Sequence, residues 1–456
     1  MGKIIPEIKI EKYQEEKLEL PISAFEVFKR LYPHCENIFL LESLGEEGKY
    51  NRYSYIGFDP LFVISAKNNE IKINNQIKKV SNAYTLLSEF SRSFDKKGKG
   101  EGYRGGLVGY LSHEATKYFE KAFKGYGNSD FPDFEFGFYL DGLRFDKKIK
   151  ECTYFCYGKS RIKKVLRLIN ASGKLDSFIF KNIGVGKSKD EHRKMILTAK
   201  EYIVKGDIFQ AVLSLKTFYK ILGDKRRIYA VLRQINPSPY MIYFKFGQRE
   251  IITASPELLI RVKGDRLEHF GTLAGTIKKG KTKEEDEILA QKLQSNDKER
   301  AEHMMLVDLA RNDVGRICEF GSIKVDNMAT VKKYSHVQHL YSEVYGKLRK
   351  GEDTFSALAA CFPAGTLTGA PKIEAMKIIS QLEGTSRGPY GGVGGFFSIS
   401  GDSMLAIIIR SIFINGEKAF TQTGSGIVLD SKPEKEFNEI INKQKAMEET
   451  LELAAI

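Results

Sequence analysis

The sequence predicts an α+β protein, and three observations support this. Strand-like runs separated by turn signals fill much of residues 36–160. Later segments have apolar residues at helical spacing. Helices and strands do not alternate in the steady βαβ pattern of a parallel sheet, and no repeat of fixed period is evident. The mixture therefore indicates layers of sheet and helix.

The first elements along the chain are strands, followed by a well-marked helix. Tyr53–Gly57 and Leu61–Ser65 have strand character. After a glycine-rich break near residues 184–186, Ser188 and Glu191 form a capping box, which predicts the start of a helix. Gly206 predicts its end. We expect the apolar face of this helix to bury Met195, Ala199 and Tyr202.

Two later helices are expected to carry carboxylates in pairs. Asn296 caps the first helix, which runs to Leu309, and Pro433 opens the second. The pairs, each spaced three residues apart on one face, are Glu299 and Glu302, and Glu436 and Glu439. Such a set suits Mg²⁺, which takes one or two protein carboxylates and leaves room for a substrate oxyanion. The alternative is two solvated helix faces, which is the better interpretation for either pair alone.

The segment Pro363–Lys372 is rich in Gly, Pro and Thr and cannot be the interior of a helix or strand. Ile373–Leu382, which follows, has helical spacing. A Gly/Thr loop that opens a helix presents free backbone N–H groups to phosphates or carboxylates. The alternative is an ordinary turn.

Composition limits the class of protein. The chain has 456 residues, of which 42% are hydrophobic and 29% charged, as in soluble globular proteins. The longest apolar run, Met404–Ile409, is too short to cross a membrane, and Met1–Glu7 lacks the apolar core of a signal peptide. Five cysteines without metal-type spacing indicate a reducing, cytoplasmic location. We expect no membrane partner.

The net charge of +14 raises nucleic acid as a partner. The basic residues are scattered in pairs, however, and no aromatic-rich RNA motif or zinc finger accompanies them. We therefore expect no nucleic acid, and a salt-dependent gel shift would test the alternative of a basic RNA-binding protein. A dispersed lysine excess also attracts dianionic substrates.

A nucleotide-binding alternative comes from residues 275–282, which fit the P-loop pattern G-x-x-x-x-G-K-[ST]. Met304–Asp308 imitates the acidic strand that accompanies such loops. The context disfavours this hypothesis, because the preceding Arg266–Gly271 is too polar for a buried central strand. Met304–Asp308 also falls inside the helix predicted from Asn296.

Several ordered motifs resemble those of the chorismate-utilising enzymes, over nearly the whole chain. Besides the segments above, the motifs are Gly206–Gln210, Ala254–Glu257, Leu273–Thr276, Glu302–Asp313, Tyr390–Gly392 and Gly424–Gly426. The resemblance implies large, mainly antiparallel sheets stacked together with helices outside. It also implies Mg²⁺ held near Glu302 and Glu439, with Glu299 and Glu436 close through water, bound to the ring carboxylate of chorismate.

The resemblance assigns further residues to the substrate. Tyr390, Arg410 and the Gly424–Gly426 amides would hold the enolpyruvyl carboxylate, because Arg supplies paired donors and Gly permits close approach. Thr366 would line the same substrate pocket, and Lys443 would be a further contact near the metal. The substrate-binding residues implied are Gly275, Thr276, Tyr390, Arg410, Gly424, Ser425, Gly426 and Lys443. Without the resemblance, Arg410 would be interpreted as a strand arginine in an ion pair, and the Gly424–Gly426 glycines as a hairpin turn.

Two residues are assigned to proton transfer by the same resemblance. Glu257, at a strand end, would protonate the departing C4 hydroxyl, which requires a pKa raised by burial. His339, in the strand-like stretch 334–345, would assist proton transfer as pyruvate is eliminated. Without the resemblance, a lone strand histidine would be read as structural.

Two positions distinguish this chain from relatives in the family. Members that add water carry a Lys base where this chain has Gln210, so Gln210 favours amination. Members that make the para-amino product, the aminodeoxychorismate synthases, usually carry a nucleophilic Lys where this chain has Ala274. Both residues indicate anthranilate as the product. Formation of anthranilate is the first committed step of tryptophan biosynthesis. The chain has no glutaminase machinery, so a separate glutamine amidotransferase subunit is expected to supply ammonia in a hetero-oligomer.

A regulatory site is implied in the N-terminal part. The segments Leu40–Ser43 and Asn236–Met241 resemble those that bind tryptophan as a feedback inhibitor. The residues concerned are Leu41, Glu42, Ser43, Pro239, Tyr240 and Met241. Read without the resemblance, the first segment is a strand and the second a turn. We expect residues 1–185 to form a regulatory region, which can interleave with the catalytic region over residues 186–456.

Overall fold

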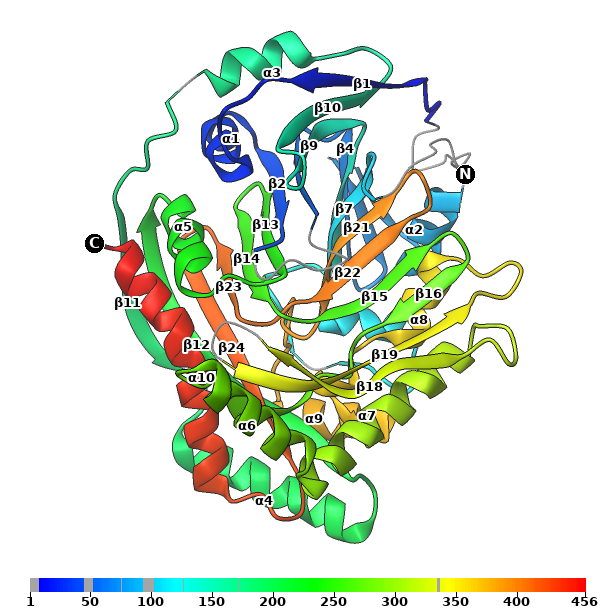
Figure 1. The fold of residues 1–456 in the computed structure, drawn as a ribbon, viewed down its shortest axis with the longest axis vertical. Helices are drawn as coiled ribbons and strands as arrows, with labels where there is room; N and C mark the ends of the chain where they lie inside the picture. The colour runs from blue at the N-terminus through cyan, green and yellow to red at the C-terminus, as the bar shows by residue number, and fades with distance from the viewer. Residues whose placement is uncertain are drawn as a thin grey trace.

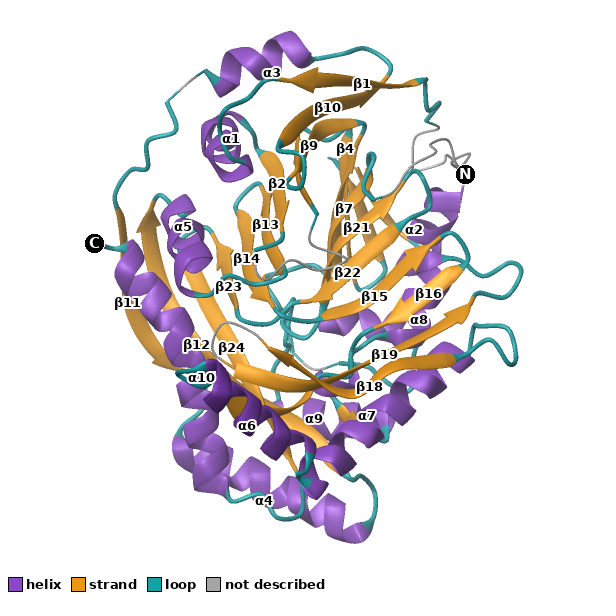
Figure 2. Ribbon diagram, viewed as in Figure 1, coloured by secondary structure: helices purple, strands orange, loops and turns teal. Residues whose placement is uncertain are grey.

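The computed structural model describes residues 8–44, 52–74, 76–92, 102–125, 127–170, 172–333 and 337–456, without the side chain of Thr276. Its centre consists of two large sheets, and the helices lie outside them (Figures 1 and 2). Each sheet has twelve strands among the described residues, and the strand pairs are antiparallel. The predicted α+β architecture of stacked antiparallel sheets is confirmed.

The first sheet, sheet A, has the strands β1 (Tyr13–Leu18), β10 (Glu151–Tyr157), β9 (Asp141–Asp146), β3 (Tyr53–Phe58), β2 (Asn37–Glu42), β13 (Tyr240–Phe246), β14 (Arg249–Ser255), β23 (Ser411–Asn415), β24 (Lys418–Ile427), β12 (Gln210–Gly223) and β11 (Phe178–Val185) in this order, with β20 (Gly369–Ala370) beside β12. The second sheet, sheet B, has β17 (Ala274–Lys278), β19 (Val337–Lys347), β16 (Arg266–His269), β15 (Leu258–Lys263), β22 (Ser403–Ile407), β21 (Val393–Ser398), β7 (Gly106–Leu111), β8 (Phe134–Tyr139), β4 (Phe62–Lys67), β5 (Glu70–Ile73) and β6 (Gln76–Lys79), with β18 (Lys324–Lys333) beside β19.

The helices are α1 (Ala24–Leu31), α2 (Ala83–Arg92), α3 (Ile162–Ile169), α4 (Lys189–Lys205), α5 (Arg226–Ile235), α6 (Lys283–Gln294), α7 (Asp297–Gly315), α8 (Thr354–Cys361), α9 (Lys372–Glu383) and α10 (Pro433–Ala454). Short 3₁₀ turns are η1 (Tyr32–His34), η2 (His113–Tyr118) and η3 (Gly365–Leu367).

Both sheets draw strands from both sides of the expected boundary at residue 185. In sheet A, β2 pairs with β13, and in sheet B, β7 pairs with β21. Figure 1 shows the blue N-terminal strands lying between green and orange strands from later in the sequence. The N-terminal region and the rest of the chain are therefore interleaved and share one pair of sheets.

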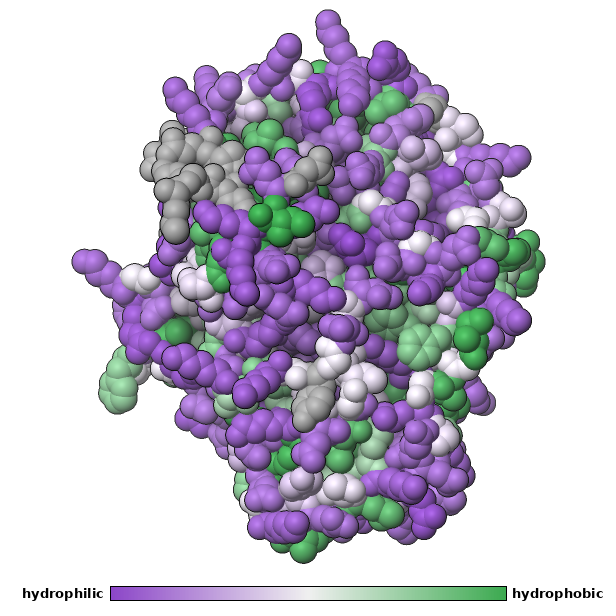
Figure 3. Space-filling model, turned by 180° about the vertical axis from the view of Figure 1, so that it is seen from behind, coloured by the Kyte–Doolittle hydropathy of each residue, from purple (hydrophilic) through white to green (hydrophobic). Residues whose placement is uncertain are grey.

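The main core lies between the two sheets. Phe244 of sheet A and Phe136 of sheet B are both completely buried in it. A second apolar cluster fills the space between sheet A and the helices α1, α5 and α10, and a third lies under α4 and α9. Burying each such aromatic side chain contributes about 2–3 kcal/mol. Figure 3 shows a rear surface that is mainly hydrophilic, as expected for a chain with 29% charged residues.

The capping signals identified three helices correctly. Ser188 and Glu191 form the predicted capping box of α4, which ends at Gly206 with φ 83°. The side chain of Asn296 accepts a hydrogen bond from the amide of Glu299 at the start of α7. Pro433 is the first residue of α10. The α7 helix continues to Gly315, past the predicted end at Leu309, because its buried face extends through Val314.

Several helices were not predicted, and one of them lies within residues 36–160, where strand-like runs were expected. The α2 helix lies in that stretch, with Tyr84, Leu87 and Phe90 buried on one face. Asn82 caps it by accepting a hydrogen bond from the amide of Thr85 at 3.0 Å. The spacing of three and the Asn cap were helix signals.

The P-loop alternative is wrong. Residues 274–278 form β17, which pairs antiparallel with β19, and Thr282 caps α6. A P-loop instead cradles phosphate between a parallel strand and a helix. Residues 304–308, which imitated an acidic strand, lie inside α7.

Two further sequence expectations concern membranes and cysteines. Within the described ranges, no helix combines the length and apolar character needed to cross a bilayer. The five cysteines are free and buried, and Cys152 and Cys156 of β10 belong to the apolar core.

Candidate active site

Glu257 lies between β14 and β15, and its side chain is buried, with 4% exposed. Thr366, in the η3 turn of the 363–372 segment, donates its hydroxyl to Glu257 Oε1 at 3.2 Å. Burial raises the pKa of the Glu257 carboxyl to about 8, although the Thr366 hydroxyl and the positive charge of Arg410 oppose the shift. A carboxyl that keeps its proton at neutral pH is suited to act as a general acid.

His339 lies on β19, and its Nδ1 donates to the carbonyl oxygen of Gly275 at 2.7 Å. This bond fixes the tautomer with the proton on Nδ1, so Nε2 is the basic nitrogen. Burial lowers the pKa of His339 to about 4, with the charges of Arg410 and Lys443 adding to the effect. The imidazole is therefore neutral at physiological pH.

Gly275 holds this histidine from a backbone position that requires glycine. Its φ is +62°, and an added Cβ would lie 2.8 Å from Glu299 Oε2. The residue that orients His339 thus lies next to a predicted metal ligand, with no room for a side chain between them. Thr276, the next residue, was predicted to bind substrate, but its side chain lies outside the described residues.

Arg410 connects the two proton-transfer residues. It follows β22, has φ +51°, and its charge influences the pKa of both Glu257 and His339. Its carbonyl accepts from the amide of Ala254 at 3.2 Å, which holds this unusual backbone against β14. An arginine whose charge acts on both an acid and a base can bind a carboxylate placed near them.

Glycines of β24 form another part of the same site. Tyr390 is buried, and an added Cβ on Gly424 would lie 3.0 Å from its hydroxyl. Lys443 on α10 donates to the carbonyl of Gly424 at 3.2 Å. An added Cβ on Gly426 would lie 2.6 Å from Gln210 Nε2. Ser425, between the glycines, is buried within β24 rather than in a hairpin turn.

The predicted carboxylate pairs on α7 and α10 face one another across the site. Gln210 Nε2 donates to Glu302 Oε1 at 3.1 Å, and Lys443 forms a 2.6 Å ion pair with Glu439. Burial raises the pKa of Glu299, and the charges of Glu302 and Glu439 raise it further. Burial also raises the pKa of Glu436, to which the charge of Glu439 contributes.

This carboxylate set matches a cation in its chemistry, although it is not a closed cage. In the described part of the chain, no three His, Cys, Asp or Glu side chains come close enough together to enclose a metal. Mg²⁺ does not require such a cage, since it keeps waters and takes few protein ligands. A cation between the helices would relieve the repulsion that Glu299 experiences from Glu302 and Glu439.

The 363–372 segment contributes differently from the anion-binding loop suggested by its composition. Its amides bond internally: Leu367 N donates to Ala364 O, and Thr368 N donates to Gly365 O. Lys372, the last residue, turns inward and forms a 2.6 Å ion pair with Asp313 of α7. The segment therefore supplies the Thr366 hydroxyl to the site rather than a ring of backbone N–H groups.

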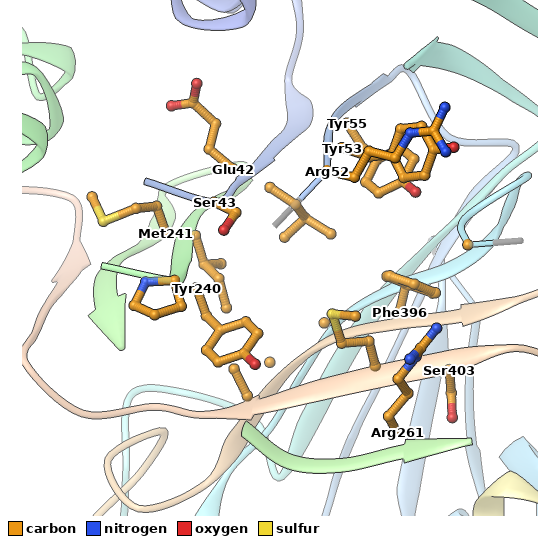
Figure 4. A pocket seen from close by; sticks show the side chains of 18 of the residues that line it. Glu42, Ser43, Arg52, Tyr53, Tyr55, Tyr240, Met241, Arg261, Phe396 and Ser403 are labelled. Carbon is orange, nitrogen blue, oxygen red and sulfur yellow. The ribbon is translucent and has the colours of Figure 1, made fainter. Parts of the chain in front are cut away.

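A separate pocket lies between sheets A and B and is lined by all six residues expected to bind an inhibitor: Leu41, Glu42, Ser43, Pro239, Tyr240 and Met241. β2 pairs with β13, with Met241 directly opposite Glu42, so the two segments are neighbours in one sheet. Other lining residues come from sheet B and include Arg261 and Phe396 (Figure 4). The pairing explains why segments about 200 residues apart form one pocket.

Glu42 and Ser43 play different parts in this pocket. The Glu42 carboxylate points away from the cavity in Figure 4 and accepts from Arg233 Nε at 2.8 Å and from Tyr229 at 3.0 Å. The Ser43 hydroxyl is buried and has no hydrogen-bond partner among the described residues. A buried hydroxyl without a partner costs about 1–3 kcal/mol, which a polar ligand would remove.

The sequence did not identify a buried pair behind the site, formed by Glu383 at the end of α9 and Arg387 in the following turn. Their spacing of four residues is common on exposed helices and gave no sign of a functional position.

Comparison with known proteins places these residues in a family context. A family model described as chorismate binding enzyme matches residues 36–449. The chain is 45% identical to anthranilate synthase component 1 of Methanothermobacter marburgensis, over 98% of this chain and 96% of that protein. It is 42% identical to the protein of the same name from Leptospira biflexa, over 99% of each. The crystal structure of anthranilate synthase component I from Streptococcus pneumoniae matches with a TM-score of 0.79 and 33% identity, over 88% of this chain and 93% of that one.

Proposed function

This chain belongs to the family of chorismate binding enzymes, and from this premise we propose that it converts chorismate and ammonia to anthranilate and pyruvate. The observation that supports the proposal most strongly is Glu257, a buried carboxyl with a pKa of about 8 and a bond from Thr366. Such a group delivers a proton to a leaving hydroxyl at neutral pH. The reaction would be the first committed step of tryptophan biosynthesis.

In this mechanism Glu257 protonates the C4 hydroxyl of chorismate as ammonia attacks the ring at C2. Thr366 keeps the carboxyl oriented through its 3.2 Å bond. Water then leaves, and the aminated intermediate still carries the enolpyruvyl group. His339, whose Nε2 is the basic nitrogen, would assist the proton transfer in which pyruvate departs and the ring becomes aromatic.

Substrate orientation would come from the groups around these two residues. Arg410 would hold the enolpyruvyl carboxylate, since its charge is felt by both Glu257 and His339. The Gly424–Gly426 part of β24 lies beyond the end of the β23 pairing, which stops at Thr421, so β23 does not cover this stretch and Lys443 reaches the carbonyl of Gly424 there. The Tyr390 hydroxyl lies beside this edge.

The proposed cofactor is Mg²⁺, held by Glu302 and Glu439 with Glu299 and Glu436 near it. When bound, it would neutralise the ring carboxylate of chorismate and make the ring a better electron acceptor. Gln210 orients Glu302 through the 3.1 Å bond, and Lys443 orients Glu439.

Gln210 and Ala274 support ammonia as nucleophile and the ortho product. Gln210 cannot remove a proton from water, whereas ammonia needs no such base. Ala274 pairs with Leu340, the neighbour of His339, and cannot form a covalent adduct with substrate. The runner-up, aminodeoxychorismate synthase, differs in its product. A partner glutamine amidotransferase would supply ammonia, and free ammonium at alkaline pH should replace it.

The deciding experiment mixes the purified chain with chorismate, Mg²⁺ and ammonium at alkaline pH and follows anthranilate fluorescence. Formation of anthranilate supports the proposal. Consumption of chorismate with the para-amino product identified by chromatography would favour the runner-up. Chorismate left intact, even with an amidotransferase partner present, would contradict both.

We further propose that the pocket lined by Ser43 and Tyr240 binds tryptophan and inhibits the enzyme. Its support is the convergence of both expected segments on one cavity and the unpartnered Ser43 hydroxyl. A bound amino acid could donate its ammonium to that hydroxyl.

Replacing Ser43 by alanine is therefore expected to raise the tryptophan concentration for half-inhibition about tenfold, because a hydrogen bond to a charged group contributes about 1.5–3 kcal/mol. Activity without tryptophan should stay at the wild-type level. Steady-state inhibition curves give the measurement, and Ser177→Ala, an exposed serine outside the pocket, is the control. Unchanged sensitivity in Ser43→Ala would remove Ser43 from the inhibitor site.

A further inference from the structure

A buried ion pair lies directly behind the proposed active site. Arg387 is 2% exposed, and its guanidinium grips Glu383 with two parallel bonds, Nε to Oε2 at 2.8 Å and Nη2 to Oε1 at 2.6 Å. A buried ion pair is often no more stabilising than an apolar pair of the same size. Its additional hydrogen bonds are therefore the more informative feature.

The remaining donors of Arg387 hold two backbone carbonyls that adjoin site residues. Nη1 donates to Leu367 O at 2.7 Å, one residue after Thr366. Nη2 donates to Val212 O at 2.7 Å, and Val212 is the strand partner of Gly426. One planar group thus fixes the distance between the η3 turn and the substrate-binding end of β24.

Glu383 extends the same connection. Its Oε1 accepts from the amide of Ser214 at 2.9 Å and from the Ser214 hydroxyl at 2.7 Å. Ser214 is the strand partner of Gly424. The guanidinium of Arg387 also lies 5.8 Å from the ring centroid of Tyr390. The pair therefore contacts the surroundings of Thr366, Tyr390 and both β24 glycines.

We infer that the Glu383–Arg387 pair is a positioning device for the reaction: it aligns the Thr366 hydroxyl with Glu257 and sets the β24 edge that receives the substrate carboxylate. The inference rests on the proposed function. Arginine is required because its rigid fork serves three acceptors in one plane, Glu383, Leu367 O and Val212 O. A lysine ammonium has neither the reach nor the planar geometry to serve all three.

Arg387→Lys tests the inference by steady-state kinetics across pH. A displacement of about 1 Å at a reacting group can cost about 10²-fold, so kcat/KM should fall by that order, with kcat lower and KM for chorismate higher. The alkaline limb of the kcat/KM profile, set by Glu257, should also move to higher pH. The Thr366 hydroxyl lowers the pKa of Glu257, and Arg410, the charged group that faces it, is unchanged in the variant.

The matched control is Arg226→Lys. Arg226 is also buried, with 5% exposed, and bonds to Asp224 with Nε to Oδ1 at 2.7 Å and Nη2 to Oδ2 at 2.6 Å. It holds the carbonyls of Lys29, in α1, and of Lys174, in the loop before β11. This variant should lose thermal stability but keep the wild-type KM and the wild-type alkaline limb.

A double variant separates positioning from general damage. If Arg387 acts through Thr366, then adding Thr366→Val to Arg387→Lys should cost clearly less than the product of the two single effects. Should Arg387→Lys fail to fold, Glu383→Gln, which keeps shape but weakens the grip, is judged by the same KM and pH criteria.

The outcomes distinguish this inference from the proposed function. A wild-type enzyme that makes anthranilate, with Arg387→Lys matching Arg226→Lys in KM and alkaline limb, overturns the positioning role alone. A wild-type protein that neither converts chorismate nor binds it, as followed by thermal shift, overturns the function and this inference with it.

Discussion

Replacement of Glu257 by glutamine is expected to lower kcat about 10³-fold, because a positioned general acid contributes about 10²–10⁴-fold and an amide cannot donate the proton. The wild-type enzyme should lose activity as pH rises through about 8, where the Glu257 carboxyl ionises. The residual activity of the variant should lack this alkaline limb. Anthranilate fluorescence with glutamine and the amidotransferase partner, so that ammonium ionisation does not interfere, gives the measurement.

The same substitution is expected to stabilise the fold. The folded-state pKa of Glu257 is about 8, above the value of about 4.5 for an unperturbed carboxyl, so the unfolded chain binds fewer protons between these values. Wild-type stability therefore falls as pH rises from about 4.5 to 8, by an amount on the order of 4 kcal/mol. Glutamine does not ionise and escapes this loss.

Thermal denaturation at two pH values checks the stability effect. The melting temperature of Glu257→Gln should exceed that of wild type at pH 8, and the two should converge near pH 4.5. A variant that is inactive and equally unstable at both pH values would instead indicate damaged packing, and Glu257 would lose its assignment as the acid.

Glu302→Gln is expected to lower kcat/KM about 100-fold at fixed Mg²⁺, since a bound metal contributes several kcal/mol of charge stabilisation. The Mg²⁺ concentration for half-maximal activity should rise as well. Binding of Mn²⁺ as a substitute ion, followed by electron paramagnetic resonance with chorismate present, should weaken in parallel.

Asp308→Asn is the control for this variant, because Asp308 is exposed on the same helix and pairs with Arg311 at 3.2 Å. It removes the same charge from α7 and should leave both measurements unchanged. Equal losses in the two variants would mean that long-range charge, rather than ligation, explains the effect, and the metal site would have to be sought elsewhere.

The local signals in the sequence were sufficient for several elements. Ser188, Asn296 and Pro433 marked helix starts correctly, because caps depend on residues within one turn. The six pocket residues and the grouping around Glu257 came from motif resemblance, and the structure brings each set together. That tryptophan and Mg²⁺ bind there stays a prediction.

Features that depend on contacts between residues distant in sequence could not be predicted from the sequence. The 363–372 segment suggested an amide-lined anion site, but its Leu367 and Thr368 amides bond within the segment, and Lys372 pairs with Asp313 on another helix. The role of Arg387 could not be predicted from the sequence, because two of its acceptors, the carbonyls of Leu367 and Val212, are distant in sequence. The residues next to Lys372 and Arg387 in the sequence do not indicate these distant partners.

The pairing of β2 with β13 limits how this enzyme could be engineered. β13 also pairs with β14, which ends at Ser255, two residues before Glu257. The proposed inhibitor pocket and the proposed general acid are therefore linked by one continuous set of backbone hydrogen bonds. Deleting the N-terminal segment would leave β13 as a bare edge and would expose the core between the sheets. An enzyme freed from the proposed product control must therefore be obtained by substitutions inside the pocket, because no removable regulatory module exists among the described strands to cut away.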